Sequence, residues 1–117
     1  MRVMVFVKAN GNFDGSSWDN PASLDSVLLE GKNRNREIWV AGGDYSTQSN
    51  IYFNAGSGMK LYGGFAPSGY PISISQRDPL VNASIITKRL EIGDVGGPAQ
   101  NVFIDGFTFT EWGHITM

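Results

Sequence analysis

The chain contains no cysteine, which excludes disulfide bonds and thiolate metal sites. Charge of one sign is also scarce, because nine Lys and Arg side chains stand against eleven Asp and Glu, a net charge of −2 at pH 7. Without a basic surface, we expect neither nucleic acid nor an anionic membrane as a partner. The one histidine, His114, would have to supply a histidine-based metal site or a catalytic triad alone, so we expect neither.

Long hydrophobic runs are missing as well. The apolar stretch within Met1 to Lys8 covers about five residues, whereas a signal peptide needs roughly 7–15. No run approaches the ~20 apolar residues of a transmembrane helix. We therefore expect no membrane insertion and no signal peptide in this chain, so that an export signal of the natural protein would lie upstream.

Glycine is plentiful instead, with 15 residues, and the apolar segments are rich in the β-branched and aromatic residues that favour strands. The 117 residues fit one domain, so we expect a single all-β domain over residues 1–117. Its clearest motif, Ile38–Gly43, returns 21 residues later as Met59–Gly64. In both copies a short strand with inward apolar residues runs into a glycine pair, as the stacked turns of a β-solenoid require.

Two later pairs of segments continue the pattern with a spacing of 17 residues, from 84–87 to 101–104 and from 90–93 to 107–110. The spacing alone leaves an antiparallel sandwich open, because its strands also recur every ~8–12 residues. We expect stacked parallel turns over residues 37–117, with the sandwich as the alternative. The alternation then predicts four nearly fully buried side chains: Val40, Leu61, Ile104 and Phe107.

The N-terminal segment, residues 1–31, predicts one strand and one helix. Arg2 to Lys8 alternates apolar with mixed side chains, which indicates a half-buried strand. Pro21 to Glu30 has the pattern of an amphipathic helix capped by Asp19 or Asn20. We expect this helix to cover the first turn of the solenoid, whose strand edges otherwise invite aggregation, through one apolar stripe: Leu24, Val27 and Leu28.

Several motifs follow one another in a fixed order: Val5–Asn10, Gly15–Asn20, Glu37–Tyr45, Leu61–Phe65, Gln76–Asp78, Asn82–Ile86 and Ile104–Phe109. Together they resemble the opening of a family of bacterial right-handed parallel β-helix proteins with the pectate-lyase-like fold. Such proteins are found at the surface of Bacteroidetes and among polymorphic outer-membrane proteins. The resemblance covers nearly the whole chain and implies a right-handed parallel β-helix, short or truncated, with one N-terminal capping α-helix.

The resemblance also implies that the chain is the N-terminal portion of an exported protein, extracellular or at the cell surface. We expect a non-catalytic structural or adhesive role, with polysaccharide as the candidate ligand. The alternative is a fragment of a carbohydrate-active β-helix enzyme, either a polysaccharide lyase or a glycoside hydrolase, because one scaffold hosts all these functions. The acidic residues are scattered, so the sequence predicts no catalytic set.

Aromatic side chains on the outer faces of the turns are the candidate glycan-binding residues, since such rings stack on sugars. The 21-residue register matches Trp39 with Lys60 and Ala41 with Tyr62, so that these side chains point away from the core. It likewise matches Asp44 with Phe65, so no acid recurs one turn later. The predicted glycan face consists of Trp39, Tyr45, Tyr62 and Trp112.

A second candidate site lies in the first loop. Asn10, Asn12 and Asp14 place oxygen atoms at alternate positions before Gly15, as in the first half of a calcium-binding loop. The second half fails, because Pro21 occupies the position of the bidentate glutamate. We therefore expect no cofactor, with calcium at this loop as the one metal candidate.

The last residues, Gly113 to Met117, end part-way into a strand of the next turn. We expect a second copy to cover the strand edges at this end, because an isologous contact between two such ends closes as a homodimer. The side chains expected in or beside that contact are Phe103, Trp112 and His114.

Overall fold

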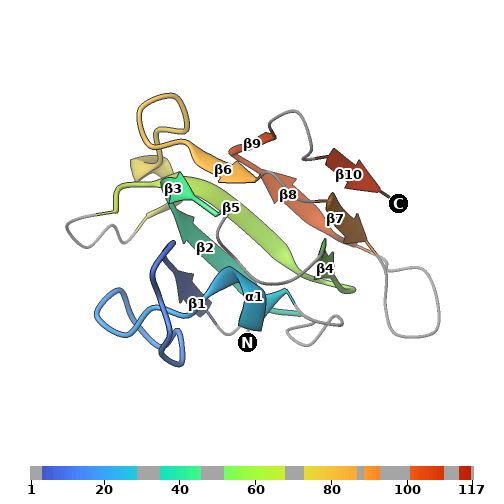
Figure 1. The fold of residues 1–117 in the computed structure, drawn as a ribbon, viewed down its shortest axis with the longest axis horizontal. Coiled ribbons are helices and arrows are strands. Elements are labelled where there is room, and N and C mark those ends of the chain that lie inside the picture. The colour runs from blue at the N-terminus through green and yellow to red at the C-terminus, as the bar shows by residue number, and fades with distance from the viewer. Residues whose placement is uncertain are drawn as a thin grey trace.

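The computed structural model describes residues 4–28, 35–45, 52–67, 73–86, 89–92, 101–109 and 114–116. Strands dominate these ranges and form three sheets (Figure 1). The strands are β1 (Met4–Val7), β2 (Glu37–Ala41), β3 (Gly43–Asp44), β4 (Tyr52–Ala55), β5 (Lys60–Phe65), β6 (Ser84–Ile86), β7 (Arg89–Ile92), β8 (Phe103–Asp105), β9 (Phe107–Phe109) and β10 (His114–Thr116). The helical elements are α1 (Leu24–Val27) and the 3₁₀ turn η1 (Ile74–Gln76).

The three sheets have the strand orders β1-β2-β5-β8, β10-β7-β4 and β3-β6-β9. After β1, the chain visits them in the same order three times: β2, β3, β4, then β5, β6, β7, then β8, β9, β10. Every pairing between these strands is parallel. The antiparallel sandwich that the spacing left open is therefore wrong, and the protein is a β-rich fold of parallel sheets.

The register between strands differs from the sequence prediction. Residue i of β2 lies beside residue i + 23 of β5, so Ile38 pairs with Leu61 and Trp39 with Tyr62. The same offset relates β6 to β9, where Ser84 pairs with Phe107. The predicted offsets of 21 and 17 are thus wrong. Because side chains alternate with a period of two, a slip of two residues keeps each β2 and β5 side chain on its predicted face.

The main core lies between the three sheets and α1. Val40 and Leu61 are fully buried, which confirms two of the four predicted core positions. Ile104 and Phe107 are only partly buried, although both pack against this core. They lie on β8 and β9, each the last strand of its sheet, so no further strand in the described ranges covers them on that side.

Helix α1 is shorter than predicted. Its N-cap is Ser23, whose side chain accepts a hydrogen bond from the Ser26 amide, so neither Asp19 nor Asn20 caps the helix. The helix cannot start at Pro21 because Ala22 is held beside β1, donating its amide hydrogen to the Phe6 carbonyl at 2.8 Å. Glu30, the predicted end, lies outside the described residues. The predicted apolar stripe is confirmed, since its three side chains are buried in the main core: Leu24, Val27 and Leu28.

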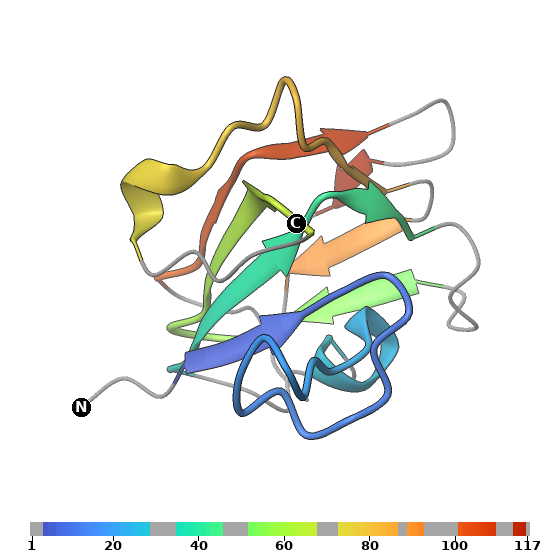
Figure 2. The same cartoon turned by 90° about the vertical axis from the view of Figure 1, so that its left-hand side faces the viewer.

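The two ends of the sheet stack differ in what lies there. In Figures 1 and 2, β1 and α1 lie at one end of the molecule, whereas β9 and β10 lie at the other. In the sheet orders, β8, β9 and β10 each occupy an edge. The N-terminal end therefore carries a helix and a loop, and the opposite end presents three strand edges.

Candidate functional site

The outer face of the β1-β2-β5-β8 sheet carries two rows of side chains. Because successive residues of a strand point to opposite faces, the register fixes which positions line up. Residues facing the main core form the row Val5, Ile38, Leu61 and Ile104. On the opposite face lie the rows Phe6, Trp39, Tyr62, Asp105 and Met4, Glu37, Lys60, Phe103.

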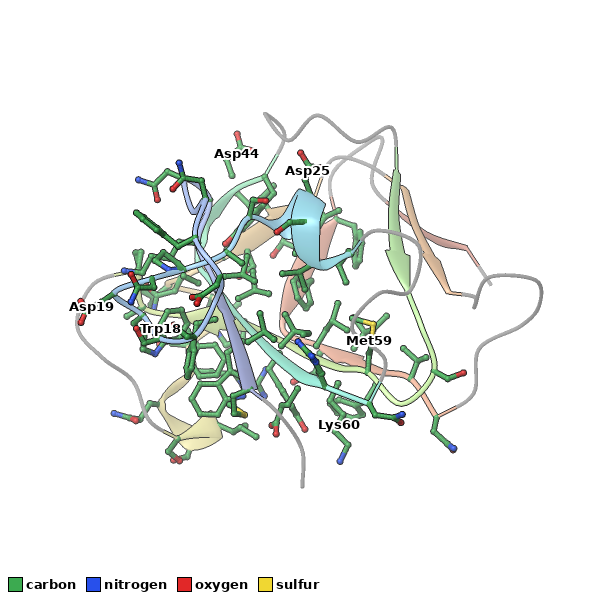
Figure 3. All side chains as sticks on the ribbon, turned by 90° about the horizontal axis from the view of Figure 1, so that it is seen from below. Trp18, Asp19, Asp25, Asp44, Met59 and Lys60 are labelled. Atoms are coloured by element: carbon green, nitrogen blue, oxygen red, sulfur yellow. The ribbon has the colours of Figure 1, made fainter. Side chains whose placement is uncertain are left out.

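Part of this outer face is covered by a second apolar cluster. Trp39 stacks on Phe65, with ring centroids 4.6 Å apart and an interplanar angle of 13°. Trp18, from the loop after β1, packs against Phe6 at 4.9 Å and against Phe65 at 5.7 Å. Figure 3 shows Trp18 beside β1. The sheet is therefore enclosed between two apolar layers over β1 and β2.

The remaining part of the face, which we call the outer patch, consists of Lys60, Tyr62, Arg77, Phe103 and Asp105. The rings of Tyr62 and Phe103 lie 5.3 Å apart with a tilt of 44°. Phe103 is 47% exposed, whereas Tyr62 is half-buried against the second cluster. Figure 3 shows Lys60 pointing away from the body of the molecule. The outer patch thus combines two aromatic rings with charged side chains at the surface.

Arg77 ties this patch together from the segment between β5 and β6. Its Nη2 lies 2.8 Å from Asp105 Oδ2, and its Nη1 donates to the carbonyl oxygens of Gly63 at 3.3 Å and Asp105 at 3.4 Å. Its Nε donates to the Ile74 carbonyl, and the guanidinium lies over the Tyr62 ring at 5.0 Å. The Arg77 side chain is only 14% exposed against 53% for Asp105. Arg77 therefore orients the Asp105 carboxylate, which remains open to solvent.

Glycine is required where the chain bends after Asp105. Gly106 has a φ of +83°, and a Cβ there would lie 2.6 Å from the Gly63 carbonyl oxygen and 2.7 Å from Arg77 Nη1. Any side chain at this position would push against the backbone of β5 and against the guanidinium. The close approach of the two glycines therefore sets the distance between Arg77 and Asp105.

The chemistry available to the outer patch is that of binding. Aromatic rings present apolar faces to the C–H groups of a sugar, and a half-exposed carboxylate accepts hydrogen bonds from hydroxyl groups. The patch holds one carboxylate, and in the described parts of the chain no three His, Cys, Asp or Glu side chains gather as a metal site would require. These groups suit recognition of a hydroxyl-rich ligand.

Of the predicted glycan face, only Tyr62 belongs to the outer patch. Trp39 points away from the main core as expected but is 6% exposed, because the second cluster covers it. Tyr45 is fully buried in the main core, where its hydroxyl donates to the Ala41 carbonyl at 2.7 Å and burial raises its pKa. The prediction that Trp39 and Tyr45 offer rings to a sugar is therefore wrong, and Trp112 lies outside the described residues.

The calcium candidates lie in an exposed loop. Asn10, Asn12 and Asp14 are all exposed, and Asp14 Oδ1 accepts a hydrogen bond from the Ser16 amide at 3.0 Å. Hydrogen bonds from Ser16 lower the pKa of Asp14, so its carboxylate stays ionised at neutral pH. The contacts of Asp14 are those of a tight turn, which Asp commonly forms.

Asp14 also borders a cavity of about 370 Å³ between this loop and α1, which Arg36 lines as well. The rest of the lining is Val5, Phe13, Ala22, Ser26 and Val27. An ionised Asp14 cannot serve as a general acid, and one carboxylate beside one guanidinium gives no catalytic set. The outer patch remains the better candidate site.

The residues predicted for a dimer contact lie at the C-terminal end of the sheets. Phe103 starts β8, an edge strand, and its exposure fits either a ligand or a partner. His114 starts β10, also an edge strand, and pairs by its backbone with Arg89 of β7. Trp112 lies outside the described residues.

Sequence reasoning missed Lys60, Arg77 and Asp105 as site residues. A register of 23 residues would have aligned Lys60 with Glu37 and Tyr62 with Trp39, and the slip to 21 hid this arrangement. Arg77 and Asp105 are 28 residues apart with no shared motif, so only the fold brings them together. No family model, curated protein or solved structure matches the chain in any of the three comparisons.

Proposed function

We propose that this chain forms turns of a right-handed parallel β-helix and serves as a structural or adhesive module that binds polysaccharide through the outer patch. The fold proposal is supported by the three successive passages through the same parallel sheets. Connections between parallel strands of one sheet are right-handed in roughly 98% of cases, which supports the handedness. In this proposal α1 caps the first turn, and its buried stripe beside β1 supports that role.

The ligand proposal is carried by one observation, the exposed Phe103 ring beside Tyr62 and the half-exposed carboxylate of Asp105. Exposed aromatic rings on a rigid sheet lose little entropy when a sugar stacks on them. Location at a bacterial surface, in an exported protein, is part of the proposal and rests on the sequence resemblance. The charge and hydropathy of the chain give no reason to prefer nucleic acid. In the described residues no helix is long and apolar enough to cross a membrane.

A glycan array probed with the full chain tests this function. We expect the wild-type chain to bind a polysaccharide and Phe103→Ala to bind it about tenfold more weakly, which corresponds to ~1.4 kcal/mol. Phe13→Ala is the matched control, because Phe13 is also exposed but lies in the loop after β1. Equal binding by all three chains would place the ligand elsewhere, and binding by none would reject the proposal.

The same experiment separates adhesion from the enzyme alternative. Prolonged incubation of the bound polysaccharide with the chain, followed by size-exclusion analysis of the sugar, would detect cleavage. An intact polysaccharide is the expected result for an adhesive module. Shortened chains would instead favour a polysaccharide lyase or a glycoside hydrolase.

We also propose a homodimer that forms through the edges of β8, β9 and β10. Exposed strand edges promote association, and here they lie beside the partly buried Ile104, Phe107 and Phe109. Two copies meeting by these edges would bury apolar surface in a closed, isologous contact, with Phe103 and His114 in or beside it. Light scattering at micromolar concentration should report a dimer. A monomer over the whole concentration range would reject this contact.

A further inference from the structure

The charges on and beside the outer patch balance one another. Lys60 and Arg77 are positive, and Asp105 is negative. Glu37, the strand neighbour of Lys60 in the register, adds a second negative charge on the same face. The face therefore carries no net charge to attract an anionic ligand from a distance.

The one guanidinium in the patch is already committed. All three nitrogen atoms of Arg77 donate hydrogen bonds within the protein, and two of them contact Asp105. Arginine recognises a carboxylate by presenting two parallel N–H donors, and here Asp105 and the backbone carbonyls occupy those donors. A uronic-acid carboxylate would have to displace Asp105 from a mostly buried partner.

The exposed charge that remains next to the rings is negative. Asp105 is 53% exposed and lies in the same row as Tyr62, so a ligand that stacks on the patch meets a carboxylate. A carboxylate accepts hydrogen bonds from sugar hydroxyls and repels an anionic sugar.

From this arrangement we infer that the outer patch selects uncharged, hydroxyl-rich polysaccharide over uronic-acid polysaccharide. The inference rests on the proposed glycan binding and adds the class of glycan. Phe103 and Tyr62 provide the stacking surface, Asp105 accepts hydrogen bonds from hydroxyls, and Arg77 is the positioning residue that holds Asp105. Lys60 completes the rim as a hydrogen-bond donor.

Isothermal titration of the full chain with a neutral xylan, a neutral β-glucan and polygalacturonate tests this selection at low and high salt. We expect the wild-type chain to bind a neutral glycan at least tenfold more tightly than polygalacturonate. We also expect that affinity to change less than twofold with salt, because few counterions are released when an uncharged ligand binds.

Asp105→Asn supplies the sharper test, because the amide oxygen can still accept from Arg77 while the negative charge is lost. This variant should gain affinity for polygalacturonate at least fivefold at low salt. Asp44→Asn is the matched control, since it makes the same charge change at an exposed residue that Figure 3 shows on the opposite side from Lys60. The control should leave polygalacturonate binding unchanged.

Two results would overturn the inference while leaving glycan binding intact. One is a wild-type preference for polygalacturonate, and the other is an unchanged polygalacturonate affinity in a folded Asp105→Asn chain. If that variant does not fold, the wild-type preference and its salt dependence still decide. Failure of the wild-type chain to bind any glycan would reject the proposed function itself, and the selection with it.

Discussion

Ser84 offers the most demanding test of how the strands are held together. It is the fully buried polar side chain of β6, and its hydroxyl accepts a hydrogen bond from the Gly64 amide of β5 at 3.0 Å. The same hydroxyl lies 3.0 Å from the Ala41 carbonyl and 3.3 Å from the Val40 carbonyl, both in β2, so it donates there. One side chain therefore joins two sheets and two successive passages of the chain.

The cost of Ser84→Ala follows from the groups that it leaves behind. The Ala41 carbonyl keeps a second partner, because the Tyr45 hydroxyl donates to it at 2.7 Å. The Gly64 amide loses its bond to Ser84, and a buried donor without a partner costs ~1–3 kcal/mol. We therefore expect Ser84→Ala to lower the free energy of unfolding by about 2 kcal/mol.

Urea denaturation followed by tryptophan fluorescence measures this loss, and thermal unfolding should show a fall in Tm of roughly 6–12 °C. Ser75→Ala is the control, because Ser75 is exposed in η1 and its change should stay within ~0.5 kcal/mol. If the two variants unfold at the same midpoint, the Ser84 hydroxyl does not join these strands and the pairing of β3 with β6 is in doubt.

Three further substitutions test the core and the cap. Leu61→Ala should lower the free energy of unfolding by ~2–5 kcal/mol, since Leu61 is fully buried in the main core, and an unchanged urea midpoint would contradict the assignment of its row. Leu28→Asp should aggregate or associate end to end in light scattering, because a charge would enter a dry contact of α1; a soluble, equally stable monomer would refute the cap. Burial raises the pKa of Tyr45, so its contribution is complete below the ordinary value near 10 and is lost as the pH rises above that value. Unfolding free energies near neutral pH and near pH 11 should therefore fall more for wild type than for Tyr45→Phe, and an equal fall would show that Tyr45 is accessible to water.

The alternation of apolar residues predicted which side chains of β2 and β5 are inside, and it did so despite a wrong register. Met59 and Leu61 are both apolar and two residues apart, so either can be matched with Ile38 without changing a face. The pattern therefore determines the buried face but not the pairing partner. Pairing depends on the neighbouring loops and glycines, which no periodicity encodes.

The short helix shows a different limit of sequence reasoning. Pro21 suits a first helical turn, yet Ala22 forms a parallel bridge with Val7 and so belongs to the strand end. The tertiary contact outweighs the local preference and moves the start of the helix to Ser23. The stripe of apolar residues survived because it lies within the part that remains helical or directly follows it.

The misplaced glycan face has a physical cause that also explains where the outer patch lies. Trp39 is amphipathic and points outward, but the loop after β1 returns across β1 and β2 and brings Trp18 over the same surface. No residue pattern within Ile38–Gly43 signals that cover, since it comes from a segment 21 residues away. Over β8 the rings are less covered, so Phe103 is exposed where Trp39 is not. The extent of the covering loop therefore decides which of the outward aromatic side chains can meet a ligand.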